Sequence, residues 1–472
     1  MSPPAKPGPL VLAGLVCGPF VSMVDSNAVN VAVPEIGREM FASLSTVGWI
    51  VSAYMLGIGI CLPATAWLAR RVGTRRLYMA ALVAFALSSA ACGLAPGIEA
   101  LIGLRAVQGI ASAPLIPLAL TLLFGGERTR GARPPMVAGL LFFLAPALGP
   151  TIGGLLIATG GWRLIFLINV PLIAIGLLGI RRLPADPPRA ESDRTPLDMA
   201  GLLVLGLGAT AAIYGASVIT GGGADVRWGW LSALAGVALL VAYPFHARRT
   251  PHPALALGLL STPATRVAVL VSVVASVVLF AVLFLIPVFV LDVQGLSPLV
   301  AGLVMLPQGI AMGVCAGLGE RFVSAWGLRA TVATGMLLLA AVTGLLLLVT
   351  PATSPWLLAL LLAGRGVALG LTLQPIIMGI MDGLAKDDMA DGSTVFNVAQ
   401  RIGGSLGVAG IAAFYQARLP QGHAFHDTVW LLMGLSLAGA VLVPLLGRRA
   451  AADPAPAFAG DQGRSRRGVS EP

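Results

Sequence analysis

The chain has 472 residues, of which 57% are hydrophobic and only 11% are charged, with a mean hydropathy of +0.91. Average soluble domains are about 25% charged, so this composition excludes a soluble protein. Continuous apolar runs of about 20 residues exclude a transmembrane β-barrel, whose strands alternate polar and apolar residues. We expect an all-α polytopic membrane protein, in which the net charge of +10 marks the cytoplasmic side and does not indicate a nucleic-acid partner.

The apolar runs predict fourteen membrane-spanning helices, each long enough to cross the hydrocarbon core. In chain order, the expected spans are residues 10–34, 46–68, 77–96, 100–124, 135–158, 164–183, 197–219, 228–246, 264–291, 299–319, 329–350, 355–381, 393–417 and 428–447. An even number of spans places both termini on the same side of the membrane.

Arginines are distributed unevenly over the loops between these spans. The loops after every second span hold Arg70, Arg71, Arg75 and Arg76, then Arg128, Arg130 and Arg133, then Arg181 and Arg182, and then Arg248 and Arg249. The opposite loops hold only Arg38, Arg163, Arg227 and Arg418. Because loops rich in basic residues stay in the cytoplasm, we expect both termini to be cytoplasmic.

Similar features recur along the chain and indicate an internal duplication. Arg105 and Arg365, the pairs Gly153-Gly154 and Gly403-Gly404, and the loop glycines Gly73 and Gly327 recur at offsets of about 250 to 260 residues. Two parallel halves that face each other across a cavity are a known transporter plan. We therefore expect six-helix bundles at 1–183 and 264–447, a cytoplasmic linker with two extra spans at 184–263, and a disordered cytoplasmic tail at 448–472.

The first predicted span carries a carboxylate, that of Asp25, well inside its apolar run. A charged Asp near a helix centre costs roughly 2.5–3.5 kcal/mol, and intramembrane acids usually mark ion or proton paths. Ser22, Asp25 and Ser26 share one side of this helix, and Asn27 and Asn30 share another. One side is expected to line a watery cavity. We predict that Asp25 carries a coupling proton; a structural pair with an arginine is the alternative.

The fourth predicted span carries a second charge inside the membrane. Arg105, Gln108, Gly109 and Ser112 lie on one helical face, at spacings of three and four residues. Asp25 and Arg105 both fall in the outer half of the bilayer. Their side chains are therefore expected to meet or to compete for the same water.

Glycines mark the fifth span and the loop after the second span. Gly149 and Gly153 form a small-xxx-small pair that lets helices approach closely, and Pro150 favours a kink. The loop after the second span carries Arg70, Arg71, Gly73, Arg75 and Arg76. Its charges can pair with neighbouring helix C-termini. We expect both segments to take part in gating, with ordinary packing and membrane topology as the alternatives.

Together these segments resemble the major facilitator superfamily, and within it the fourteen-helix drug:proton antiporters of the EmrB/QacA type. The first-span pattern of that group, L-D-x-T-I-V-N-V-A-L-P, is similar to residues 24–34. Its patterns R-x-x-Q-G with a later Pro and G-P-x-x-G-G are similar to residues 105–117 and 149–154, and the segment that opens its sixth span is similar to residues 162–171. The loop after the second span departs, because Ala66 replaces a usual Gly and Arg70 a usual Asp. The usual acidic partner in this loop is therefore missing, so either gating is weakened or another carboxylate takes its place.

The resemblance implies roles for individual residues. Asp25 would be the protonation site, Arg105 would assist coupling, and Gly149, Pro150, Gly153 and Gly154 would mark export. Polar residues within apolar runs are expected to line a cavity between the halves: Ser26, Asn27, Asn30, Gln108, Ser112, Gln374, Asn397, Gln400 and Arg401. Acids inside the membrane are few, so neutral, monocationic or zwitterionic lipophilic substrates are expected.

The expected function is proton-coupled efflux of small lipophilic compounds across the bacterial cytoplasmic membrane by alternating access. A dedicated exporter of one metabolite or self-made antibiotic is the alternative. The sequence has neither a phosphate-binding loop nor clustered metal-ligating residues, so we expect no enzyme, no cofactor and no metal. The expected partners are the lipid bilayer, protons and the substrates, with a periplasmic adaptor as a further partner in two-membrane bacteria.

Overall fold

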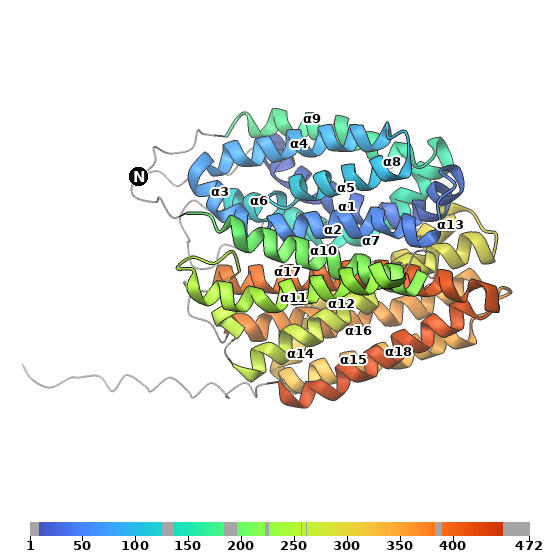
Figure 1. Ribbon diagram of the computed structural model, residues 1–472. Helices are drawn as coiled ribbons and strands as arrows, with labels where there is room; N and C mark the ends of the chain where they lie inside the picture. Colours follow the sequence, from blue (N-terminus) through green and yellow to red (C-terminus); the bar gives the residue numbers. More distant parts are fainter. Residues whose placement is uncertain are drawn as a thin grey trace, which may run out of the picture.

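The computed structural model describes residues 9–124, 136–183, 196–221, 226–255, 257–260, 262–382 and 389–446. Every regular element in these ranges is a helix, and the long helices lie side by side (Figure 1). Among the described residues, twelve helices are long and apolar enough to cross a membrane. Helices α7 (Met136–Gly160) and α17 (Met389–Arg418) coincide with the two other predicted spans, so the structure is compatible with fourteen. The predicted all-α membrane fold is confirmed.

The first half of the chain contains α1 (Pro9–Glu39), α2 (Leu44–Cys61), α3 (Ala64–Val72), α4 (Thr74–Gly93), α5 (Ile98–Ser112), α6 (Leu115–Phe124), α7, α8 (Arg163–Leu167) and α9 (Asn169–Ile180). Helices α10 (Met199–Gly221) and α11 (Val226–Arg249) and the short η1 (Leu257–Leu260) follow. The second half contains α12 (Pro263–Val288), η2 (Phe289–Val293), α13 (Pro298–Gly317), α14 (Gly319–Trp326), α15 (Leu328–Leu345), η3 (Leu346–Leu348), α16 (Pro355–Asp382), α17, η5 (Leu419–Gln421), α18 (Ala424–Leu442) and η6 (Val443–Leu445).

Prolines explain where predicted spans are interrupted. The second predicted span, 46–68, is divided, because α2 ends at Cys61 and the short α3 begins after Pro63. The fourth, 100–124, is divided between α5 and α6 at Pro114. Proline lacks a backbone N–H and clashes with the preceding turn, so it starts a new helical segment more readily than it continues one.

Helix packing repeats between the two halves. Helix α1 packs against α7, α2 against α5 and α4 against α9, and in the second half α12 packs against α17, α13 against α16 and α15 against α18. The halves meet where α7 packs against α13 and where α17 packs against α2. Exchanging the halves converts one of these interfaces into the other. Figure 1 shows the first half above and the second half below in its orientation.

The loops that follow the second predicted span of each half, after α3 and after α14, share one backbone feature. Gly73 connects α3 to α4 with φ 95°, and Gly327 connects α14 to α15 with φ 80°. Only glycine adopts such left-handed conformations without strain. The repeat of this glycine turn supports the duplication that the sequence predicts.

An arginine after each glycine turn binds the end of another helix. Arg75 donates hydrogen bonds to the carbonyls of Ile180, at 3.3 Å, and Arg181, at 2.9 Å, where α9 ends. Arg329 donates to the carbonyl of Leu446, just after α18 and η6. A cationic side chain stabilises a helix C-terminus, where carbonyls lack intrahelical partners. The pairing that the sequence predicted for the loop arginines therefore occurs at Arg75 and has a counterpart in the second half.

The extra helices α10 and α11 pack against each other, and α10 also packs against α2 and α17, in front of the boundary between the halves (Figure 1). Asp198, just before α10, accepts hydrogen bonds from the N–H groups of Gly201 at 2.8 Å and Ala254 at 3.0 Å, and lies 2.8 Å from His246 Nε2. Burial raises the pKa of Asp198, but these hydrogen bonds outweigh it and hold the pKa below its ordinary value. This carboxylate joins the start of α10 to the end of α11.

Candidate functional site: a buried ion pair beside a central cavity

Asp25 and Arg105 form an ion pair in the core of the first half. Asp25 on α1 is 1% exposed and Arg105 on α5 is 0% exposed. Arg105 Nη1 donates to Asp25 Oδ2 at 2.6 Å. Of the two outcomes left open by the sequence, the side chains meet. A buried pair needs further hydrogen bonds to offset the loss of water around both charges.

Amide and hydroxyl groups supply those hydrogen bonds. Asn169 Nδ2 donates to Asp25 Oδ1 at 3.0 Å, and Gln108 Oε1 accepts from Arg105 Nη1 at 2.7 Å. Ser89 Oγ accepts from both amides, at 2.9 Å from Asn169 and 3.0 Å from Gln108. The sequence singled out Gln108, but it missed Asn169 and Ser89, which only the packing of α4 and α9 brings to the pair.

Arg105 has two further contacts and one unsatisfied group. Its Nε donates to the carbonyl of Ile50 at 3.2 Å, and its guanidinium carbon lies 4.0 Å from the centre of the Tyr54 ring. Its Nη2 has no hydrogen-bond partner in the described part of the chain. The guanidinium is therefore held by α1, α2 and α5 together, and it depends on Asp25 for charge neutralisation.

Tyr54, whose ring packs on the Arg105 guanidinium, and two serines lie between this pair and a cavity. The Tyr54 hydroxyl donates to Ser112 Oγ at 2.9 Å, and Ser112 Oγ lies 2.5 Å from Ser22 Oγ. Ser22 and Ser112 both line a cavity of about 580 Å³, which extends to Arg70 in the α3–α4 segment. The cavity therefore reaches from the neighbourhood of the ion pair to the arginine-rich end of the bundle.

A smaller cavity of about 230 Å³ lies between the halves. Ser26, Asn27 and Pro150 line it from the first half, and Gln400 and Arg401 of α17 line it from the second. Arg401 lines the larger cavity as well. Arg401 of α17 is thus common to the lining of both cavities, and each cavity is lined by residues from both duplicated halves.

The structure places the remaining predicted cavity residues differently. Asn397 lines the larger cavity and donates to the carbonyl of Ser393 at 2.8 Å. Asn30 is buried, donates to the carbonyl of Ser26 at 3.2 Å, and lines neither cavity. Gln374 also lines neither, and lies beside Gly319 of α14. Gln108 belongs to the ion-pair cluster.

The glycines of α7 allow backbone to approach backbone. A Cβ atom on Gly149 would lie 2.6 Å from Asn27 Cβ, and one on Gly153 would lie 2.7 Å from the carbonyl oxygen of Ala28. A Cβ on Gly154 would lie 2.3 Å from the carbonyl oxygen of Pro298, across the boundary between the halves. The motif therefore packs α7 against α1 on one side and against α13 on the other.

Hydrogen bonds also cross the boundary between the halves. Ser52 and Ser405 exchange hydroxyl-to-carbonyl bonds of 3.1 and 3.2 Å, and Thr151 donates to the carbonyl of Gly302 at 3.0 Å. Leu44 N donates to Gln416 Oε1 at 3.3 Å, where α2 begins and α17 ends. That contact lies at the opposite end of α2 from the arginine-rich α3–α4 segment, so the halves are joined at that end.

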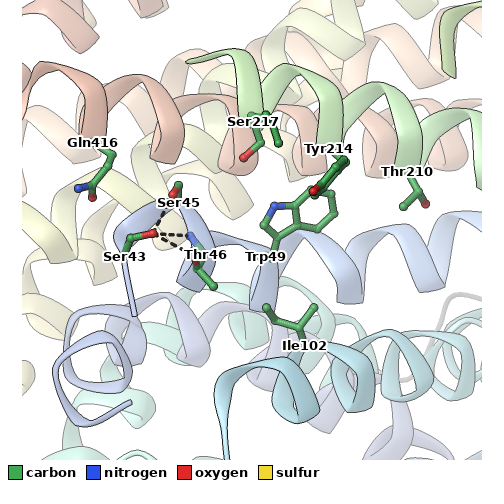
Figure 2. Close-up of a pocket in the computed structure, with 10 residues that line it drawn as sticks. Ser43, Ser45, Thr46, Trp49, Ile102, Thr210, Tyr214, Ser217 and Gln416 are labelled. Atoms are coloured by element: carbon green, nitrogen blue, oxygen red, sulfur yellow. Dashed lines mark hydrogen bonds between the residues drawn. The ribbon is translucent and has the colours of Figure 1, made fainter. Parts of the chain in front are cut away.

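Figure 2 shows a third cavity, of about 650 Å³, lined by α2, α5, α10 and α17. The rings of Trp49 and Tyr214 lie next to each other in its wall, with their centres 6.3 Å apart and their planes tilted by 52°. Its polar lining consists of uncharged groups, such as Ser217 and Gln416. The extra helix α10 forms one wall, so the sequence pattern of the two halves did not predict this cavity.

Comparison with known proteins identifies the family. The sequence profile of the Major Facilitator Superfamily matches residues 15–408. The chain is 32% identical over 411 residues to the Multidrug resistance protein B homolog of Mycobacterium tuberculosis (85% of this chain, 75% of the relative). It is 28% identical over 419 residues to the Multidrug transporter protein MdtP of Bacillus subtilis (87% and 75%).

A solved structure shows the same fold at low sequence identity. A crystal structure of a mutant of the nucleoside transporter NupG superimposes with a TM-score of 0.61 at 12% identity, and the match covers 93% of this chain and all of NupG. This likeness concerns the fold alone. The matching profile, the similar bacterial relatives and the shared fold agree with the sequence motifs: the chain belongs to the Major Facilitator Superfamily, and within it to the drug:proton antiporter family.

Proposed function

We propose that the protein exports small lipophilic compounds across the bacterial cytoplasmic membrane in exchange for protons. The observation that carries this proposal is the buried Asp25–Arg105 pair, which lies beside Tyr54 and close to a cavity lined by both halves. The names of the relatives, which include multidrug resistance and multidrug transport, support the substrate class. Loop arginines support cytoplasmic termini.

The two halves supply the moving parts of an alternating-access cycle. We assign residues 1–183 and 264–447 to them, with the two extra helices between. In the proposed orientation the cavity of about 580 Å³ opens toward the cytoplasm at Arg70. The Ser52–Ser405 and Leu44–Gln416 contacts close the outer side. This arrangement corresponds to an inward-facing state, and rocking about the α7–α13 and α2–α17 interfaces would open the other side.

Protonation of Asp25 changes the charge of the buried cluster. A proton from outside would neutralise the carboxylate and leave the Arg105 guanidinium without a counter-charge in a buried site. An uncompensated buried charge is costly, so the protonated cluster favours a different packing of α1 against α5. Release of the proton to the cytoplasm would restore the pair. Each proton would thereby bias the conformational change that carries substrate outward.

Proteoliposomes test this function directly. With the cytoplasmic side of the protein facing outward, a lumen more acidic than the bath should drive lipophilic compounds from the bath into the lumen. A protonophore should abolish this uptake, because the pH gradient is the proposed source of energy. Uptake that is unchanged when the gradient is collapsed, under otherwise identical conditions, would contradict proton antiport.

A further inference from the structure

The charged side chains that line the two central cavities, of about 230 and 580 Å³, are arginines. Arg401 on α17 lines both cavities, and Arg70 lines the larger one near its cytoplasmic end. Neither cavity has an Asp or Glu among its described lining residues. Asp25 is buried against Arg105 and reaches neither cavity. A substrate that enters the space between the halves therefore meets positive charge and no fixed negative charge within the described lining.

Arg401 differs from Arg105 and Arg365, the two fully buried arginines, because it has no hydrogen bond or ion pair with a described residue. Arg105 pairs with Asp25, and Arg365 donates to Thr343 and, at 3.2 Å, to the carbonyl of Val278. Arg401 makes no hydrogen bond or ion pair within the part of the chain that the structure describes. The Arg401 side chain is partly exposed and lines both cavities, so its guanidinium is available to an anionic ligand.

Two amide side chains line the smaller cavity and form no hydrogen bond with the described residues. Gln308 on α13 is 3% exposed, and Gln400 precedes Arg401 on α17. The side chains of both glutamines form no hydrogen bond with the described part of the chain. The rest of the smaller cavity is mostly apolar, with Leu279, Phe280, Leu283, Met305, Met312 and Leu373 in its wall. The site thus combines hydrogen-bond donors with an apolar surface.

Resting on the proposed export function, we infer that this cavity binds small amphipathic anions, such as aromatic carboxylates or sulfonates. The acid group would accept charge-assisted hydrogen bonds from Arg401, with Gln308 and Gln400 as further donors. The apolar body would pack against the methionine, leucine and phenylalanine side chains. A cationic analogue would face the like charge of Arg401. The preferred substrate class therefore extends beyond the neutral, monocationic and zwitterionic compounds expected from the sequence.

Equilibrium binding to the purified full-length chain in detergent tests this inference. Calorimetric titrations would compare 2-naphthoate, 2-naphthamide and 2-naphthylmethylammonium, which share one apolar ring system and differ in charge. The wild type should bind naphthoate about tenfold more tightly than either analogue, the effect of one charge-assisted hydrogen bond. Arg401→Gln should remove this preference while leaving naphthamide binding unchanged, and Arg401→Lys should retain part of it.

The matched control is Arg227→Gln, which removes an exposed arginine from α11, away from both central cavities. It should leave the preference for naphthoate intact. Equal binding of the three compounds by the wild type would overturn the inference, as would a preference for the acid that persists in a folded Arg401→Gln variant. The wild-type comparison decides the question even if that variant does not fold. Binding is measured without a pH gradient. Failure of proton-driven uptake would therefore refute antiport and leave the measured preference for naphthoate unchanged.

Discussion

Replacing Arg105 by glutamine should reduce pH-gradient-driven uptake to the background of empty liposomes. The change removes the counter-charge from a carboxylate that is 1% exposed, which leaves Asp25 either charged at high cost or permanently protonated. Breaking a buried pair by removing one partner costs about 3–5 kcal/mol of stability. Uptake in proteoliposomes and the unfolding temperature in detergent measure the two effects.

A double-mutant cycle separates the pair from its surroundings. If the two charges stabilise each other, Asp25→Asn combined with Arg105→Gln should be less destabilising than the sum of the single changes, by about 1–3 kcal/mol. The double variant should remain inactive because it has no protonation site. Strict additivity of the two single changes would show that Asp25 and Arg105 do not interact in the folded protein.

Replacing Gly154 by alanine should separate the two halves and abolish transport. The added Cβ would lie 2.3 Å from the carbonyl oxygen of Pro298 and 2.9 Å from its carbonyl carbon. These are backbone atoms, so α7 and α13 must move apart along an interface that also contains Gly302. Overpacking typically costs about 1–3 kcal/mol. We expect a lower unfolding temperature together with loss of uptake.

Gly434→Ala in α18 is the matched control, because a Cβ there would meet no atom within 4 Å. The same substitution should leave stability and uptake near the wild-type values at this position. If Gly154→Ala transported as well as Gly434→Ala, the close approach of α7 to α13 would not be needed for the cycle.

The helices could be predicted from sequence because each apolar run is about as long as a membrane span requires, or longer. The predicted span 355–381, for example, corresponds to α16 at Pro355–Asp382. The breaks after Cys61 and at Pro114 were missed, since the flanking residues are apolar enough to continue either span. The offset between Gly73 and Gly327 indicated a duplication. The structure adds that Arg75 and Arg329, which follow these glycines, both donate to carbonyls at the end of another helix.

The ion pair could be predicted from the sequence, but the residues around it could not. Asp25 and Arg105 stand out because charges are rare inside apolar runs. Asn169, Ser89 and Tyr54 are uncharged, and only tertiary packing shows that they contact the pair directly or through Gln108. Polarity alone selected Arg401, which does line the cavities, and also Gln374, which does not, because polarity does not reveal the direction of a side chain.

The most direct test of the central claim is uptake by Asp25→Asn in proteoliposomes with an imposed pH gradient. Asparagine keeps the shape of the side chain but cannot carry the proton. We predict that the variant loses gradient-driven accumulation, while it still binds a transported compound and exchanges it between bath and lumen when no gradient is present. Accumulation equal to that of the wild type would contradict the account, because the coupling proton would then be carried by another group.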